Sequence, residues 1–340
     1  MSDLARATEP DAPLLEVQGL QVTFAGRVGL GAGLLGRRGS VARAVDGVSL
    51  SVMPGEVLAL AGESGCGKTT LARTILGLER PRRGRILFNG RPIDARGLRA
   101  YRRRVQMVFQ DPAGALNPRQ TVYESVAEGL RVHGIHDREE ERVAEALAAA
   151  GLRPPERFYL LYPHELSGGQ RQRVVIAGAL VLEPRLIVAD EPASMLDASV
   201  KGEILQLLLR LRAEYGLALL VVTHDLGLAW TIADRVAVMY LGRIVEVGPA
   251  EAVLTEPLHP YTKALLEVAP ERGGEVTTRQ ILSGEPPDPN RIPSGCRFHP
   301  RCPVVLSGEA ARRGSEERNR TEEPALREIR PGHFAACHLA

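Results

Sequence analysis

Short apolar runs that suit buried strands alternate along the chain with segments whose apolar residues recur at helical spacing. The run at residues 57–61 leads into a glycine-rich loop, and residues 68–78 then carry Leu71, Ile75 and Leu78 on one helical face. This order predicts a strand, a loop and a helix in direct succession.

Two further apolar runs, at residues 186–189 and 218–223, are separated by the helix-like segment 201–215. Buried strands joined by crossover helices are typical of a parallel sheet. Residues 121–162 are rich in Ala, Glu and Arg and show apolar positions at helical spacing. The pattern therefore predicts an α/β core with an inserted helical subdomain.

The C-terminal part of the chain differs in composition from the rest. Beyond a hairpin-like segment at residues 235–248, proline and arginine become frequent, so regular structure is expected to thin out. Four cysteines in 340 residues are too few for a disulfide scaffold. Three of the four nevertheless fall in this tail.

Composition is that of an ordinary globular protein, with 44% apolar and 25% charged residues. The net charge of +2 creates no overall field that would attract nucleic acid, and we expect no nucleic-acid partner. No apolar stretch approaches the roughly 20 residues that span a bilayer, and residues 1–13 lack the order of a secretory signal. A cytoplasmic location is therefore expected.

The glycine-rich loop fits the phosphate-loop pattern in full. It consists of Gly62, Glu63, Ser64, Gly65, Cys66, Gly67, Lys68 and Thr69, followed by Thr70. Backbone N–H groups of such a loop face phosphates, and the following helix adds the positive end of its dipole. Lys68 would reach the terminal phosphates and Thr69 would ligate Mg²⁺. The thiol of Cys66 is expected to fill space in the loop rather than act as a nucleophile.

The apolar run at 186–189 ends in two carboxylates, Asp190 and Glu191. In a phosphate-loop enzyme the first carboxylate can hold Mg²⁺ through water, and the second can orient or deprotonate the attacking water. The pair therefore predicts ATP hydrolysis when it is combined with the phosphate loop.

A second set of small residues precedes another helix-like run. It comprises Ser167, Gly168, Gly169 and Gln170. A helix N-terminus of this kind can also take phosphate oxygens. Together with the phosphate loop and the Asp-Glu strand, this stretch resembles the signature of ATP-binding cassette (ABC) ATPases, in which one subunit's signature completes the other subunit's ATP site. The resemblance covers residues 14–248.

The resemblance implies a fold and domain limits. The fold would be a phosphate-loop ABC core with an antiparallel β subdomain and a helical subdomain inserted at about residues 115–180. The ABC ATPase domain would span residues 14–250, and residues 251–340 would form a small C-terminal extension that carries the prolines and cysteines.

The resemblance also assigns roles to single positions. Gln110 resembles the glutamine that touches Mg²⁺ and senses the transmembrane partner, and His224 resembles the switch histidine that contacts the γ-phosphate. Phe24 resembles the aromatic residue that stacks on adenine. Met195, in the segment 194–197 that resembles the loop crossing the dimer interface, stands where the family more often has a small residue.

Residues 106–118 and 257–266 resemble the ATPase subunits of oligopeptide and dipeptide importers. Residues 44–49 and 65–67 resemble the F-type subunit, which usually works as a heterodimer with a D-type ATPase. The implied partners are that second ATPase, two transmembrane permease subunits and an extracytoplasmic substrate-binding protein. The chain would then lie peripherally on the cytoplasmic face of the inner membrane. Nickel and glutathione importers use related subunits, so the cargo stays open.

The tail at residues 293–303 resembles the C-terminal module of these importers, where thiolates at such spacing can hold an iron–sulfur cluster. The candidate ligands are Cys296, Cys302 and Cys337. A further cysteine of the family, expected near residues 307–310, is missing. A cluster would then need another ligand, for which the candidates are His299, His333 and His338. Without a cluster, the tail is a proline-rich segment with buried thiols.

The sequence thus predicts an ABC ATPase that uses ATP and Mg²⁺ to energise peptide import. Glu191 would polarise the water, Lys68 and Mg²⁺ would offset phosphate charge, and Ser167 and Gly169 would complete the site of the partner. The alternative from another class is a soluble ABC ATPase of DNA repair or translation. That alternative predicts a long coiled-coil insertion or two cassettes in one chain, and the sequence contains neither. An exporter subunit is disfavoured by the resemblance at residues 259–261.

Overall fold

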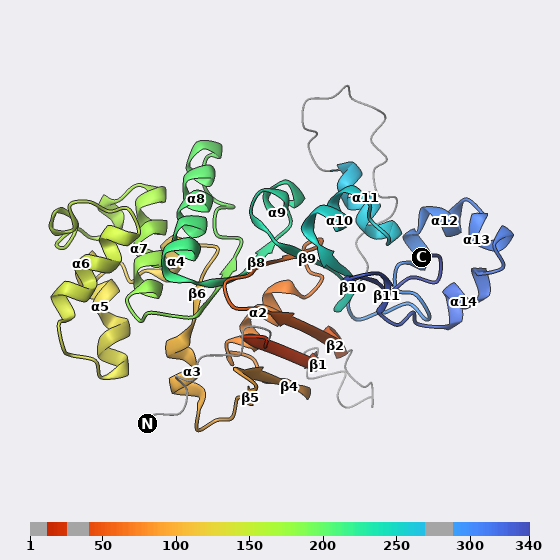
Figure 1. The fold of residues 1–340 in the computed structure, drawn as a ribbon, viewed down its shortest axis with the longest axis horizontal. Helices are drawn as coiled ribbons and strands as arrows, with labels where there is room; N and C mark the ends of the chain where they lie inside the picture. The colour runs from red at the N-terminus through yellow and green to blue at the C-terminus, as the bar shows by residue number, and fades with distance from the viewer. Residues whose placement is uncertain (1–11, 26–40, 269–287) are drawn as a thin grey trace, which may run out of the picture. The chain divides into compact units, whose positions relative to one another are not determined.

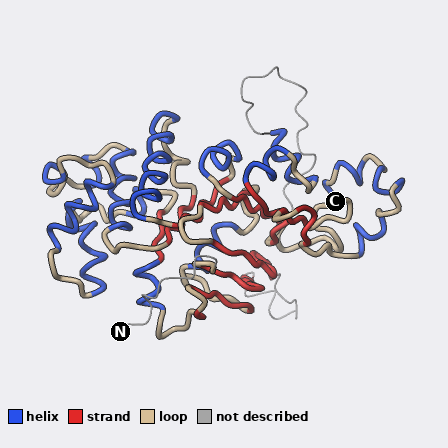
Figure 2. Tube along the Cα trace, viewed as in Figure 1, coloured by secondary structure: helices blue, strands red, loops and turns tan. Residues whose placement is uncertain are grey.

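The computed structural model describes residues 12–25, 41–268 and 288–340 (Figures 1 and 2). The chain divides into two compact units. The first unit centres on Leu87–Val222, and the second combines Glu16–Ser51, Leu58–Ile86 and Thr223–Ala340. The interpretation of residues 1–13 as lacking a secretory signal falls almost entirely outside the described residues.

The first unit contains a parallel ladder of three strands. These strands are β6 (Val105–Val108), β7 (Leu186–Asp190) and β8 (Ala218–Thr223). β7 lies between the other two and pairs with both in parallel. All residues of β7 and β8 are buried, as expected for strands covered on both faces. The two apolar runs predicted as parallel strands are therefore confirmed.

Helices supply the rest of the first unit, and α5, α6 and α7 pack against one another (Figure 1). The helices are α3 (Leu98–Arg104), α4 (Pro112–Ala115), α5 (Val122–His133), α6 (Glu139–Ala149), α7 (Gly168–Leu180) and α8 (Ala198–Tyr215), with short 3-10 turns at Pro155–Arg157 and Pro163–Glu165. Helix α5 begins at a capping box, because the Thr121 hydroxyl accepts from the Glu124 amide while the Glu124 carboxylate accepts from the Thr121 amide. The predicted helical insertion is confirmed.

The second unit contains the phosphate-loop strand and a small sheet. In that sheet β1 (Leu15–Ala25) lies between β2 (Val41–Val52) and β4 (Arg83–Phe88). The last residues of β4, Leu87 and Phe88, belong to the first unit and pair antiparallel with the two-residue β5 (Arg91–Pro92) of that unit. Strand β3 (Val57–Ala61) pairs in parallel with β9 (Arg235–Tyr240), which forms an antiparallel hairpin with β10 (Arg243–Pro249).

The helix after the phosphate loop is shorter than the sequence predicts. Helix α2 (Lys68–Ile75) ends before Leu78, whose side chain is 51% exposed. Gly77 adopts φ +68°, and the amides of Gly77 and Leu78 bond back to the carbonyls of Thr74 and Arg73. This pair of backbone hydrogen bonds terminates a helix, and glycine adopts the required left-handed backbone at low energetic cost. The placement of Leu78 on the helical face was therefore wrong.

The tail contains more regular structure than its composition suggests. The second unit also contains α9 (Leu226–Ile232), which precedes β9. The elements of the tail are α10 (Ala250–Thr255), α11 (Pro260–Val268), a 3-10 turn (His299–Arg301), α12 (Pro303–Leu306), α13 (Glu309–Arg312), α14 (Glu316–Thr321), β11 (Arg327–Arg330) and β12 (His333–Ala335). Strand β12 pairs antiparallel with β10 and with β11, so the end of the chain extends the β9–β10 hairpin. The sequence predicts that regular structure becomes rare in the tail, and this prediction is correct only in that the helices are short. Several of them begin at a proline.

A buried carboxylate joins the tail to β10. Glu246 is fully buried and accepts from the amides of Leu258 (2.8 Å) and His259 (2.9 Å), and it contacts Nε2 of His333 at 2.8 Å. Burial lowers the pKa of His259 to about 3, so this imidazole is neutral, and its Nδ1 accepts from the Tyr261 amide at 3.0 Å. The histidine and tyrosine of residues 257–266 therefore have a structural role in the second unit.

Three aromatic rings pack the tail onto β9. Tyr240, Tyr261 and Phe298 come from β9, α11 and the tail, and their ring centroids lie 4.5–5.3 Å apart. All three are at most 1% exposed. Tilted and edge-on pairs of this kind add stability beyond the apolar area that they bury. The tail is therefore part of the core of the second unit.

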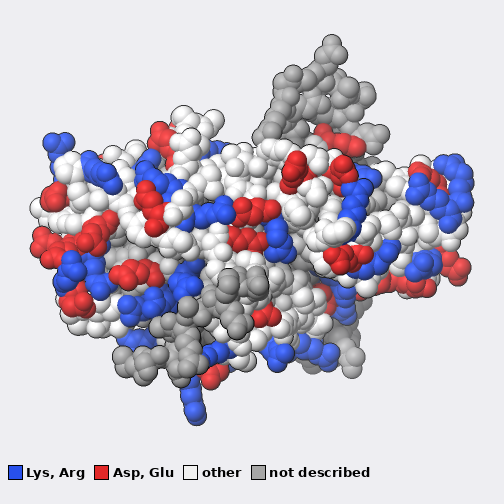
Figure 3. All heavy atoms as spheres, viewed as in Figure 1, with Lys and Arg blue, Asp and Glu red and all other residues white. Residues whose placement is uncertain are grey.

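The surface carries charges of both signs. On the face drawn in Figure 3, Lys and Arg side chains are interspersed with Asp and Glu side chains, in keeping with a net charge of +2. Within the described residues, no helix combines the length and the apolar character needed to cross a bilayer.

Replacing Phe298 with alanine should lower the free energy of unfolding by about 3–5 kcal/mol, because a fully buried ring leaves a cavity between two other rings. Leu306→Ala is the matched control, since that side chain is 59% exposed, and it should change stability by less than about 0.5 kcal/mol. Urea unfolding of both variants measures the difference. Equal losses would contradict the placement of the tail in the core.

Candidate functional site

The phosphate loop connects β3 to α2, as the sequence predicts. Two of its glycines lie close to the backbone of Met239 and Ala44. A Cβ atom at Gly62 would stand 2.3 Å from the carbonyl oxygen of Met239, and one at Gly67 would stand 2.0 Å from that of Ala44. Both glycines also have left-handed φ values, +151° and +111°. No other residue fits these two positions without moving the backbone. Ser64, Gly65 and Thr69 are exposed, and Thr70 is half-buried.

The side chain of Lys68 folds back onto the phosphate loop. This side chain is buried, and Nζ donates to the carbonyl oxygens of Gly62 (2.7 Å) and Glu63 (2.8 Å). Sγ of Cys66 lies 3.8 Å from the same ammonium. Burial raises the pKa of the Cys66 thiol, which therefore stays protonated at neutral pH and fills space inside the loop.

Two residues that the sequence reasoning did not select contact Glu63. The guanidinium of Arg301 pairs with its carboxylate, and the phenol oxygen of Tyr261 accepts from its amide at 2.9 Å. They lie 238 and 198 positions away in the sequence, so no local pattern links them to the loop. Their only sequence signal is that both lie in the motifs used above to identify the importer subfamily.

In the first unit, a hydrogen bond from Gln110 holds the carboxylate of Glu191, the second residue of the Asp-Glu pair. Glu191 follows β7, and one carboxylate oxygen accepts from Nε2 of Gln110 at 2.9 Å. Its backbone has φ +47°, and its amide donates to the carbonyl of Val222 on β8 at 2.9 Å. A left-handed backbone is uncommon at a non-glycine residue and costs conformational energy, so the surrounding contacts must hold Glu191 in it. Asp190, the last residue of β7, is 5% exposed.

The signature residues form the N-terminus of α7. The Ser167 hydroxyl accepts from the Gln170 amide (3.2 Å), and the Gln170 side chain accepts from the Ser167 amide (2.9 Å). Ser167 and Gly168 are exposed, while a Cβ at Gly169 would meet Val200 at 2.8 Å. The resulting helix end presents small residues to the surface, as an anion-binding terminus requires.

The remaining predicted residues lie at strand ends. His224 follows β8 and Phe24 is the penultimate residue of β1, and both side chains are exposed. Met195 is 63% exposed. The described structure thus places the phosphate loop, His224 and Phe24 in the second unit, and Gln110, Asp190, Glu191 and the signature in the first.

The three tail thiols are buried and lie near one another. Burial raises the pKa of Cys296 to about 12, and the neighbouring Cys337 and Cys302 contribute to the rise. The candidate histidine ligands are engaged elsewhere: His299 with the Cys296 carbonyl, His333 with Glu246 and His338 with the Glu322 carbonyl. Across the described ranges, no group of three or more His, Cys, Asp or Glu side chains is arranged to hold a metal. These residues do not fit an iron–sulfur cluster.

The Mg²⁺ ligands predicted from the sequence are a hydroxyl, an amide and a carboxylate, from Thr69, Gln110 and Asp190. Magnesium prefers hard oxygen donors, takes few of them from the protein, and completes its shell with water and phosphate. The chemistry of this donor set fits the ion.

Comparison with known proteins agrees with these features. Residues 45–194 match the family model for ABC transporters, and residues 245–308 match that for the C-terminal region of oligopeptide/dipeptide transporters. A putative peptide import ATP-binding protein of Brucella ovis is 44% identical over 96% of this chain and 98% of its own length. The oligopeptide transport ATP-binding protein AppF of Bacillus subtilis is 43% identical over 90% of this chain and 92% of its own length.

Solved structures show the same core. The cbiO1 protein of Clostridium perfringens, part of an ABC transporter complex, aligns with a TM-score of 0.61 at 32% identity over 72% of this chain and 91% of its own. A dimeric ATP-binding cassette in a post-hydrolysis state with ADP and Pi aligns with a TM-score of 0.59 at 30% identity over 69% of this chain and 98% of its own. On the strength of its near full-length relatives, the chain belongs to the ABC transporter ATP-binding proteins of the oligopeptide/dipeptide importer type.

Proposed function

We propose that this ABC ATPase hydrolyses ATP to energise the uptake of di- or oligopeptides through partner permease subunits. Two near full-length relatives named for peptide or oligopeptide import support the cargo class, as does the match of residues 245–308 to the transporter C-terminal region. The single observation that carries the enzymatic part is the Gln110–Glu191 contact beside Asp190. It orders a carboxylate at the end of a buried strand.

In this proposal the ATP phosphates bind the phosphate loop and Lys68 neutralises part of their charge. Glu191 accepts a proton from the attacking water, and Gln110 holds the carboxylate of Glu191 in place. When bound, Mg²⁺ offsets the negative charge of the phosphates, and Thr69, Gln110 and Asp190 hold it. His224 contacts the γ-phosphate and Phe24 stacks on adenine.

The proposed assembly pairs the chain, as an F-type subunit, with a D-type ATPase subunit. The exposed helix end at Ser167 and Gly168 supports this arrangement, because an anion-binding terminus at the surface is available to a nucleotide held by another subunit. Two permease subunits and an extracytoplasmic binding protein complete the importer. The chain lies on the cytoplasmic face of the inner membrane. Its ATPase domain spans residues 14–250 and its extension residues 251–340.

Replacing Glu191 with glutamine should lower kcat for ATP hydrolysis by about 10²–10⁴, the usual contribution of a general base, while ATP binding is retained. The amide is nearly isosteric but cannot take the proton. Glu214→Gln, an exposed carboxylate on α8, is the matched control and should hydrolyse ATP as the unmodified chain does. Phosphate release at saturating ATP and Mg²⁺ measures both variants. Near-normal turnover of Glu191→Gln would contradict the assigned role.

Lys68→Ala should weaken ATP binding by about 10- to 100-fold, because the loop loses its only cation. Lys263→Ala, which removes an exposed lysine from α11, should leave binding unchanged. Titration with a fluorescent ATP analogue measures both dissociation constants. Equal affinities of the two variants would rule out the phosphate-loop assignment.

We also propose that the tail thiols pack as protonated side chains without a cluster. At pH 8 the raised pKa of Cys296 should slow its alkylation in the folded protein, and alkylation in urea should be fast. Anaerobic purification followed by iron and sulfide analysis provides the decisive test. Near-stoichiometric iron and sulfide would overturn this part of the proposal.

A further inference from the structure

Residues 296–302, here called the tail turn, reach the phosphate loop through an arginine. The guanidinium of Arg301 is 7% exposed and donates from Nη1 to Oε2 of Glu63 (2.8 Å) and from Nη2 to Oε1 (3.1 Å). This is a bidentate Arg–carboxylate pair, the geometry in which such pairs are strongest. Glu63 immediately follows the first glycine of the loop.

The backbone of Glu63 is engaged as well. Its amide donates to the phenol oxygen of Tyr261 (2.9 Å), and its carbonyl accepts from Nζ of Lys68 (2.8 Å). Tyr261 is held in turn between Tyr240 and Phe298, and Phe298 belongs to the tail turn. The carboxylate, amide and carbonyl of this one residue therefore all have partners, and two of these partners come from the C-terminal part of the chain.

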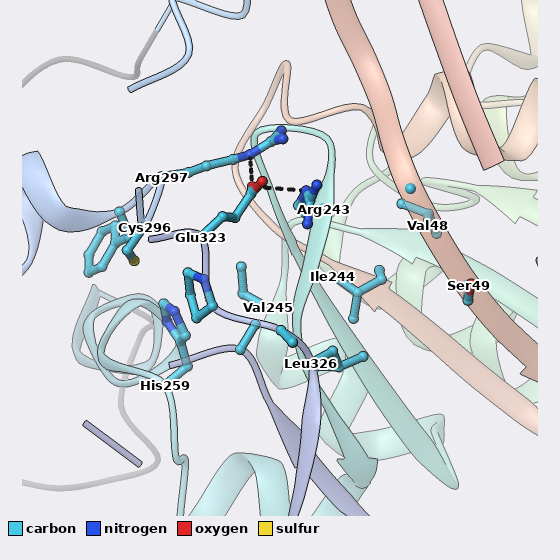
Figure 4. Close-up of a pocket in the computed structure, with 15 residues that line it drawn as sticks. Val48, Ser49, Arg243, Ile244, Val245, His259, Cys296, Arg297, Glu323 and Leu326 are labelled. Carbon is cyan, nitrogen blue, oxygen red and sulfur yellow. Dashed lines mark hydrogen bonds and ion pairs between the residues drawn. The ribbon is translucent and has the colours of Figure 1, made fainter. Parts of the chain in front are cut away.

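The tail turn is fixed at a second point by Arg297. This guanidinium is 5% exposed and pairs with Asp46 of β2 and with Glu323, whose Oε1 lies 2.7 Å from Nε. Figure 4 shows Arg297 and Arg243 both directed at the Glu323 carboxylate. Two buried arginines four residues apart thus anchor the tail turn, one to β2 and one to the phosphate loop.

The pairing has an electrostatic consequence for ATP. Glu63 is the only acidic residue in the loop 62–69, which binds phosphate anions in the proposed function. An uncompensated carboxylate there would repel the phosphates, and a partly buried ion pair that loses one partner leaves a costly lone charge. Arg301 offsets that charge and fixes the position of the Glu63 carboxylate.

We propose that Arg301 is a positioning residue for ATP binding: by neutralising and fixing Glu63, it keeps the phosphate loop competent for nucleotide and couples the C-terminal extension energetically to the ATP site. The inference rests on the proposed function of the loop. Because such coupling is reciprocal, ATP should in turn strengthen the attachment of the tail turn.

A double-mutant cycle on the full-length chain tests this directly, with the dissociation constant for ATP as the readout. Arg301→Ala should weaken ATP binding by about 10- to 100-fold, and more strongly at low salt, where charge repulsion is less screened. Glu63→Gln keeps the shape of the side chain and removes its charge, so it should change the dissociation constant for ATP by a smaller factor than Arg301→Ala does. The combined Glu63→Gln, Arg301→Ala variant should recover to within about threefold of Glu63→Gln, and Arg301→Lys should retain part of the affinity.

Arg318→Ala is the matched control, because it removes an exposed arginine that pairs with Glu322 within the same extension, and it should bind ATP normally. A merely structural role would not produce rescue by Glu63→Gln, since removing the charge of Glu63 cannot refill the space that the Arg301 side chain leaves. Normal binding by Arg301→Ala, or a combined variant as weak as Arg301→Ala alone, would overturn the proposal.

Titration of Lys68→Ala in parallel distinguishes an error in the positioning role of Arg301 from an error in the proposed function of the loop. If Lys68→Ala loses affinity while Arg301→Ala does not, only the positioning role is wrong. If neither variant loses affinity, the phosphate-loop assignment is wrong and the positioning role falls with it.

Discussion

The close approach of backbone to the phosphate loop is the constraint on which the second unit depends. Gly62 lies under the carbonyl of Met239 on β9, and Gly67 lies under that of Ala44 on β2, with no space for a Cβ at either position. The loop can therefore curl only if the β3–β9 ladder and strand β2 stand where they do. A loop fixed in this way presents its amides without a reorganisation cost when phosphates arrive.

The C-terminal extension is built into this arrangement rather than appended to it. Strand β12 continues the β9–β10 hairpin, Glu246 ties together the start of α11 and the tail, and the three aromatic rings fill the space beside β9. Arg301 then reaches the loop itself. Under the positioning role proposed for Arg301, an extension that shares its core with the loop strand would transmit its own state to nucleotide binding.

Much of this could be predicted from the sequence because the signals are local. The phosphate loop, the buried strands that end in Asp190 and Thr223, and the helix beginning at Gly168 each depend on a few neighbouring residues. The extent of α2 was missed because the stop at Gly77 outweighs the apolar periodicity that continues to Leu78. The partners of Glu63 were missed because tertiary packing brings them in from about 200 positions away, where no spacing rule applies.

The central claim, that this ATPase drives a membrane importer, is tested most directly by identifying its partners. The Glu191→Gln protein, isolated with ATP from native membranes under mild detergent, should bring two multi-span permeases and a second ABC ATPase subunit, identified by mass spectrometry. Recovery of ribosomal or DNA-repair proteins with no membrane protein would contradict the claim and favour a soluble mechanical ATPase.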